Sequence, residues 1–276
     1  MRHAVSTHLF VNHRLTVALL DRLVKAGFHE VEIFCARQHL DYRNRAQVEE
    51  LAHWFRDADL KLHSMHSPMF SDTIWGRSGP NAVVSITEAE KSRRIAATDE
   101  IKRALEVAEL IPFRYLIQHI GAGGEEYDDR KMDLAFTSLE ELCIFAGHRQ
   151  VEILVENIPN ELSTPERLVH FANQTRLPIH FVFDTGHAHI MGGVKAGFER
   201  MRDRIRSTHV HDNDAVNDIH LFPNGTRPGG IDWTECMELL RPGQENYPLL
   251  VELREVPDME HPLDEVRRVF DWLENL

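Results

Sequence analysis

Along the chain, short runs rich in β-branched and aromatic residues alternate with longer segments whose apolar residues recur at helical spacing. This alternation is typical of βα units that form a parallel sheet. Eight runs predict strands, at residues 3–10, 29–35, 61–66, 113–120, 151–157, 178–184, 206–212 and 247–253. The intervening and final segments predict helices at residues 15–27, 45–59, about 87–111, about 129–148, from 163, after 184 to about 203, from 232, and 262–276.

The number of these units indicates the fold. Eight βα units in 276 residues, with no linker or low-complexity stretch between them, predict one closed (β/α)8 TIM barrel of the α/β class over residues 1–276. The alternative is an open, doubly wound sheet. No G-x-G-x-x-G follows the first strand, which argues against the dinucleotide-binding version of that sheet, and no nucleotide cofactor is expected.

Three helix starts carry capping patterns. Thr87 with Glu90 predicts a capping box at the start of the third helix. The run Ser163-Thr164-Pro165-Glu166 predicts a start with proline in the first turn. Asp232, with Glu235 three residues later, predicts the cap of a short helix.

The ends of the predicted strands carry an unusual set of polar residues. In a (β/α)8 barrel, reactive groups come from the carboxyl ends of the strands and the loops that follow them. Six of the residues close strands three to eight, and three more follow strands six and seven. The nine candidates are His66, His119, Glu156, Asp184, His209, Glu252, His187, Asp218 and His220.

Strand alternation supports this placement. If Glu156 points into the barrel, Leu154 and Glu152 do so too. The outward residues of that strand would be Val151, Ile153 and Val155, which are apolar as helix-packed positions should be. Similarly, an inward Glu252 leaves Leu249, Val251 and Leu253 facing out. His209 and His211 share a parity, so both side chains could face the barrel mouth.

Four of the candidates are carboxylates, and their convergence predicts a metal. Glu156, Asp184, Asp218 and Glu252 would repel one another strongly in a partly buried mouth. A divalent cation removes that conflict. Histidine and carboxylate ligands without cysteine suit zinc, manganese, cobalt or iron better than calcium. Among the remaining histidines, His189 and His211 are the best additional candidates.

Composition narrows the function classes. The chain has 31 Lys and Arg against 44 Asp and Glu, a formal charge of −13, which argues against a protein that grips nucleic acid phosphates. It has 18 His but only three widely spaced Cys, which predict free thiols in a reducing cytoplasm. The first residues contain no signal-peptide core, and no stretch is apolar enough to span a membrane.

Several strings together are similar to those of a known superfamily. ILVEN, FVFDTGHA, THVHDND, DIHL followed by a Gly-rich turn and GIDW, and LLVEL resemble the xylose-isomerase-like barrels, with weaker matches at 66–68 (HSP) and 118–121 (QHIG). That superfamily includes sugar isomerases and epimerases, related dehydratases, and apurinic endonucleases of the endonuclease-four type. The resemblance extends from strand two to strand eight.

The epimerase branch of this superfamily implies one metal and an acid/base pair. By resemblance, Glu156, Asp184, His209 and Glu252 hold the metal. The same two glutamates would act as acid and base on the substrate carbon, and His187 would contact a substrate oxygen.

The endonuclease branch implies a larger centre. It adds five ligands to the same four to hold three zinc ions, and their counterparts here are His66, His119, His187, Asp218 and His220. All five residue types are present, so the ligands alone do not exclude a phosphodiesterase. The segment 223–230, PNGTRPGG, departs from the compact turn expected of the endonucleases and puts the placement of Asp218 and His220 in doubt.

The loops favour a small substrate over DNA. The segment 121–130, GAGGEEYDDR, places four acids beside the mouth, where they would repel phosphates. Only Arg77, Arg227 and Arg254, with Phe70 and Trp75, could serve DNA there. We therefore expect a metal-dependent isomerase or epimerase that moves a proton through an enediolate on a sugar or keto-sugar, or a related dehydratase.

Two alternatives stay open: a zinc-dependent apurinic endonuclease-like phosphodiesterase, and a barrel that binds a sugar without turning it over. The expected partner is a small polyhydroxylated substrate, contacted by His187, His211, Arg254 and Trp75. No membrane or nucleic acid partner is expected, and the sequence leaves homo-oligomerisation open.

Overall fold

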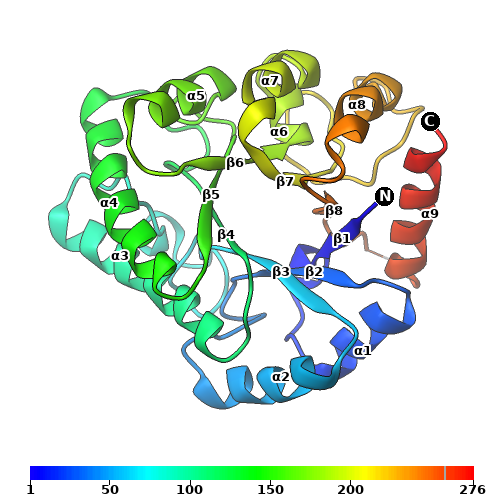
Figure 1. Cartoon of the computed structure of the whole chain (residues 1–276), viewed down its shortest axis with the longest axis horizontal. Helices are drawn as coiled ribbons and strands as arrows, with labels where there is room; N and C mark the ends of the chain where they lie inside the picture. The colour runs from blue at the N-terminus through cyan, green and yellow to red at the C-terminus, as the bar shows by residue number, and fades with distance from the viewer. Residues whose placement is uncertain (258) are drawn as a thin grey trace.

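A computed structural model describes residues 1–257 and 259–276. In it, eight parallel strands form a central barrel surrounded by helices, as Figure 1 shows in a view along the barrel axis. The predicted single (β/α)8 barrel is therefore confirmed. The strands are β1 (His3–Ser6), β2 (Glu30–Phe34), β3 (Lys61–His66), β4 (Tyr115–Gln118), β5 (Glu152–Glu156), β6 (His180–Asp184), β7 (Ile205–His209) and β8 (Leu249–Val251).

The helices lie outside this barrel (Figure 1). They are α1 (Val17–Lys25), α2 (Arg45–Asp57), α3 (Lys91–Leu105), α4 (Asp129–Gly147), α5 (Pro165–Gln174), α6 (Thr185–Ile190), α7 (Val194–Met201), α8 (Trp233–Leu240) and α9 (Pro262–Glu274). Short 3-10 helices cover Thr7–Phe10, Gly79–Ala82, Glu106–Glu109, Arg202–Arg204 and Arg241–Gly243. None of the helices in the described ranges is long and apolar enough to cross a membrane.

The predicted alternation along β5 is confirmed. Val151, Ile153 and Val155 belong to the main core between strands and helices. Leu154 instead packs inside the barrel, in a small cluster with Tyr115, Ile117 and Val182. The same holds at the end of the chain's last strand, where the outward residues Leu249, Val251 and Leu253 all lie in the main core.

The barrel closes at a seam between β7 and β8. Each strand pairs in parallel with its neighbour from β7 back to β1, and β1 pairs with β8. Among the described residues, β7 and β8 are joined by a single isolated bridge, Val210 with Val251. The Thr208 hydroxyl supplements it by donating to the Pro248 carbonyl (2.8 Å) and accepting from the Leu250 amide (3.2 Å).

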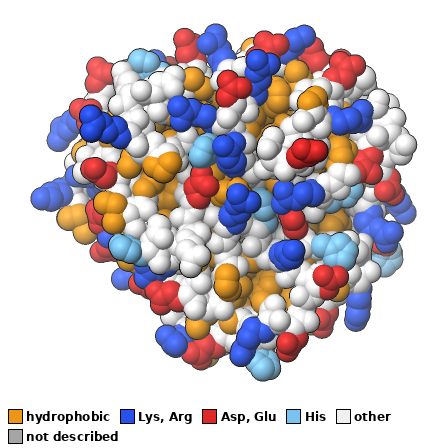
Figure 2. Space-filling view, viewed as in Figure 1, with side chains coloured by type: hydrophobic (Ala, Val, Ile, Leu, Met, Phe, Trp, Pro, Cys, Tyr) orange, Lys and Arg blue, Asp and Glu red, His pale blue; other side chains and the backbone are white. Residues whose placement is uncertain are grey.

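Charged and polar side chains occupy the amino ends of the strands. Arg2 pairs with Glu30 at 2.8 Å, and Arg206 lies 3.2 Å from the His180 ring, which in turn contacts Glu152. Figure 2 shows Lys, Arg, Asp, Glu and His side chains mixed over the middle of the face turned to the viewer. Side chains at this end of a (β/α)8 barrel contribute to stability and not to the chemistry of the site.

Three predicted boundaries were wrong. The first strand ends at Ser6 and not residue 10, because Ser6 caps a 3-10 helix over Thr7–Phe10 and accepts from the His8 amide. The helix predicted from 184 to 203 is two helices, α6 and α7, separated by Gly192 and Gly193 with φ of 118° and 112°. Only glycine adopts that backbone readily.

The third error concerns Thr87, which does not cap α3. That helix starts at Lys91, and Glu90 at its N-cap position makes no side-chain cap hydrogen bond. The Thr87 hydroxyl instead donates to Glu125 (3.2 Å). By contrast, Thr164 and Asp232 cap α5 and α8 as predicted, by accepting from the amides of Arg167 and Glu235.

Candidate metal centre

All nine candidate ligands come together at the carboxyl end of the barrel. They form three adjoining groups in which the ligand atoms of each group lie within 4.8 Å of one another. Glu156 belongs to two groups, and His211 joins the third. The groups are His66, His119 and Glu156; Glu156, Asp184, His209 and Glu252; and His187, His211, Asp218 and His220.

The four-residue group with Glu156 is the deepest. Its members stand at the ends of β5, β6 and β7 and directly after β8, and none is more than 2% exposed. The Nδ1 atom of His209 lies 2.8 Å from Glu156, 3.3 Å from Glu252 and 4.0 Å from Asp184. Strand register explains the approach, because Asp184 and His209 are paired positions of β6 and β7.

The group with His66 and His119 extends from the other oxygen of Glu156. His119 Nε2 lies 2.9 Å from Glu156 Oε2, and His66 Nε2 lies 3.5 Å from it. The two Nε2 atoms are 3.2 Å apart. His66 Nδ1 donates to the Ser67 carbonyl (2.9 Å), which leaves Nε2 as the nitrogen that can accept a cation.

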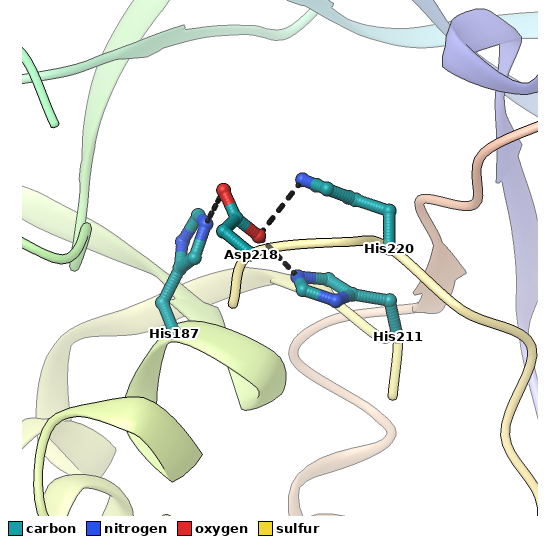
Figure 3. Close-up of side chains that lie close together, drawn as sticks. All are labelled: His187, His211, Asp218 and His220. Atoms are coloured by element: carbon teal, nitrogen blue, oxygen red, sulfur yellow. Dashed lines mark ion pairs between the residues drawn. The ribbon is translucent and has the colours of Figure 1, made fainter. Parts of the chain in front are cut away.

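The third group surrounds Asp218, which projects from the loop after β7 (Figure 3). Its two oxygens lie 3.1 Å from His187 Nε2 and 3.2 Å from His220 Nε2. His211 lies 4.0 Å from Asp218 and 3.1 Å from Asp184. The loop thus brings Asp218 and His220 to the mouth, although its sequence departs from the endonuclease turn.

The DTGH segment is built around Asp184 and His211. Asp184 caps α6, since its Oδ1 accepts from the His187 amide at 2.6 Å, while Oδ2 faces His211. Gly186 leaves room for the His211 ring, because a Cβ there would lie 2.1 Å from Cε1 of that ring. Asn157 exchanges two 2.9 Å hydrogen bonds with the backbone of Asp184 and so fixes the start of the segment.

Within the described part of the chain, the buried carboxylates of this centre (Glu32, Glu156, Asp184 and Glu252) form ion pairs only with histidines. Burial alone would raise the pKa of Glu156, but His209 and hydrogen bonds from His119 and His66 bring it well below its ordinary value. Burial would likewise lower the pKa of His187, yet Asp184 and Asp218 raise it to about 10. Negative charge therefore dominates the site and is balanced only by these rings.

These donors fit a divalent cation. Nitrogen and carboxylate oxygen are the ligands of zinc, manganese, cobalt and iron sites. In addition, the buried Oε1 atom of Glu252 has no hydrogen-bond partner among the described residues. A buried carboxylate oxygen without a donor is costly, and a cation would satisfy it.

A cavity of about 160 Å³ opens above the three groups. Its apolar wall includes Phe34, Met69 and Trp75, where Trp75 meets the Phe34 ring edge-on at 5.3 Å between centroids. Arg254 is the one Lys or Arg that lines it within the described ranges. His211 does not line it; the ring is fully buried and stacks on His220 at 4.0 Å.

Sequence reasoning missed three residues at this site. His8 lines the cavity and approaches the Leu253 carbonyl (3.1 Å); it was hidden by the overlong first strand. Asn157 follows Glu156 directly and its role depends on the β6 backbone. Glu32 is fully buried and contacts His209; an acid between Val31 and Ile33 in the apolar part of β2 was the available signal.

The known proteins that resemble this chain share little of its sequence. It is 23% identical over 222 residues to the uncharacterized protein y4fM of Sinorhizobium fredii, covering 74% of this chain and 70% of that one. A D-tagatose 3-epimerase-like protein superimposes with a TM-score of 0.76 at 20% identity, over 100% of this chain and 99% of the other. The IOLI protein, crystallised with a zinc atom, gives 0.76 at 15% identity over 99% and 98%.

These structural likenesses show the fold. The family is shown by the sequence, since the xylose isomerase-like TIM barrel family matches residues 20–276. With the barrel and its ligand-rich mouth described above, the chain belongs to the xylose isomerase-like TIM barrel family.

Proposed function

We propose that the protein is a divalent-metal-dependent isomerase or epimerase of a small sugar or keto-sugar, with dehydration as a related outcome of the same site. The observation that carries this proposal is the position of Glu156 and Glu252. Both line the floor of one small cavity and both approach His209 Nδ1, at 2.8 Å and 3.3 Å. Two carboxylates beside one substrate carbon can remove and return a proton.

Glu156, Asp184, His209 and Glu252 are the proposed ligands of the principal cation. When bound, the cation would polarise the carbonyl and hydroxyl oxygens of the substrate. The cavity volume of about 160 Å³ suits a small molecule. Trp75 offers an apolar wall to a sugar, and Arg254 and His187 offer hydrogen bonds to its oxygens.

The two glutamates are not equivalent. Glu156 is held at both oxygens, by His209 and by His119. Glu252 keeps Oε1 without a hydrogen-bond partner among the described residues. We therefore assign proton removal to the Glu252 carboxylate. Proton return falls to Glu156, which would receive the proton that it delivers from the His119 ring at 2.9 Å.

Deuterium exchange tests this proposal. Ketoses and inososes incubated with the metal-loaded protein in D₂O should gain deuterium at the carbon next to the carbonyl, as read by NMR or mass spectrometry. Glu252→Gln protein, loaded in the same way, is the control. Absence of exchange across a broad panel would contradict the proposal.

A phosphodiesterase is the second candidate, because the site has three ligand groups where an isomerase needs one. Clustered cations can activate water and stabilise a leaving oxygen. Elemental analysis separates the candidates: about one tightly bound ion per chain favours the isomerase, and three zinc ions with cleavage of abasic DNA favour the phosphodiesterase.

We also propose that the protein acts in a reducing cytoplasm. Support comes from its three cysteines, which are all free thiols, with Cys35 and Cys236 fully buried.

A further inference from the structure

Glu32 is a buried acid that the proposed reaction does not use. It lies on β2 inside the barrel and is fully buried. Its Oε2 accepts from the Ser64 hydroxyl at 2.8 Å and lies 3.2 Å from His209 Nε2. Its Oε1 has no partner among the described residues. No Lys or Arg of the described ranges pairs with this carboxylate.

The His209 ring therefore lies between two sets of carboxylates. Nδ1 faces the Glu156 and Glu252 oxygens, at 2.8 Å and 3.3 Å, whereas Nε2 faces Glu32. A neutral imidazole has one N–H, and the hydrogen bond of one nitrogen decides which nitrogen keeps its lone pair. Without Glu32, the proton would stay on Nδ1, where Glu156 is the better acceptor.

We propose that Glu32 is a positioning residue of the metal centre, which holds His209 as the tautomer protonated on Nε2 and thereby leaves Nδ1 free to bind the cation. This rests on the proposed metal-dependent function. Ser64 supports this arrangement, because its hydroxyl donates to the same Glu32 oxygen that accepts the hydrogen bond from His209 Nε2. Carboxylates that orient a metal-bound histidine are worth 10–100-fold in metal affinity in other proteins.

Glu32→Gln separates this role from mere packing. The amide has nearly the same volume, but the negative charge that draws the His209 proton to Nε2 is lost, and the amide N–H can donate to that nitrogen instead. We expect zinc affinity, measured by competition with a chromophoric chelator, to fall by about 10–100-fold. The visible spectrum of the cobalt-loaded variant should change as well, because the ligand field of His209 changes.

Glu152→Gln is the matched control. Glu152 lies at the start of β5 and contacts His180, at the opposite end of the barrel from the centre. It should leave zinc affinity and the cobalt spectrum as in the wild type. Circular dichroism and Tm establish that each variant is folded.

The outcomes are separable. A wild-type protein that binds no divalent cation overturns both the proposed function and this inference. Wild-type affinity in a folded Glu32→Gln protein overturns this inference alone. If that variant does not fold, ¹H–¹⁵N correlation spectra of the zinc-loaded wild type decide: a proton on His209 Nε2 supports the assignment, and a proton on Nδ1 overturns it.

Discussion

Glu156 and Glu252 differ in how their oxygens are held, and substitutions should separate them. Glu252→Gln removes the carboxylate with an unpartnered oxygen, so kcat should fall by about 10²–10⁴-fold. Glu156→Gln disturbs two of the three ligand groups and should lose bound metal as well. Steady-state kinetics together with metal analysis checks this; equal metal loss in both variants would contradict it.

The His211 ring leaves no room for a side chain at Gly186. Gly186→Ala would place a Cβ within 2.7 Å of three His211 ring atoms. Because backbone and a fully buried ring must then shift, we expect a loss of about 1–3 kcal/mol in unfolding free energy and weaker metal binding. Gly147→Ala, where a Cβ meets open space within 4 Å, is the control in urea unfolding. An unchanged Gly186→Ala protein would refute the packing argument.

At the scale of elements, a side-chain cap should contribute to stability only at the helices that have one. Thr164→Ala should cost about 1 kcal/mol, because its hydroxyl oxygen caps the Arg167 amide of α5. Glu90→Ala, at the start of α3 where no side-chain cap exists, should stay within about 0.5 kcal/mol of wild type. Parallel urea titrations compare the two; a larger loss for Glu90→Ala would reverse the assignment.

What the sequence could predict depended on how local the determinants were. Strand alternation and the capping motif of α5 involve neighbours in the chain, and both were predicted correctly. The hydroxyl of Thr87 pairs with Glu125, 38 residues away, so its local Thr-x-x-Glu pattern was misleading. The contact of Glu32 with His209 spans 177 residues, and no periodicity reveals such a pair.

The same distinction applies to the site. The strand-end rule of (β/α)8 barrels located the nine ligand candidates, because each lies at the end of a strand or in the segment that follows it. The rule did not locate His8, because β1 ends at Ser6 and a 3-10 helix changes the direction of the chain there. The doubt over Asp218 arose from an irregular loop, where the left-handed backbone of His220 (φ 47°) and not a repeating pattern sets the geometry.

At the scale of the whole molecule, His63 should make stability depend on pH. Burial lowers its pKa in the folded protein from 6.5 to about 4. Between these values the unfolded chain binds the extra proton, so stability is present above about pH 6.5 and declines as pH falls towards 4. At pH 5 the loss should be about 2 kcal/mol.

Urea unfolding from pH 8 to pH 5 measures this effect. His63→Gln keeps a polar group near Ser207, whose hydroxyl contacts His63 at 3.2 Å, but it cannot titrate. The variant should therefore lose less stability than the wild type over this range. Parallel pH profiles for the two proteins would show that His63 is not responsible.

The seam between β7 and β8 has a consequence for biosynthesis. A ribosome releases the chain from its amino end, so β2, β5, β6 and β7 emerge with Glu32, Glu156, Asp184 and His209 well before β8 does. Glu252 arrives only after β8, which is bound between β1 and the Thr208 hydroxyl. Until β8 is in place, Glu32, Glu156 and Asp184 lie in a barrel that has not yet closed. Nascent chains stalled before residue 247 should therefore be unable to hold the cation tightly, and metallation becomes a step that follows translation.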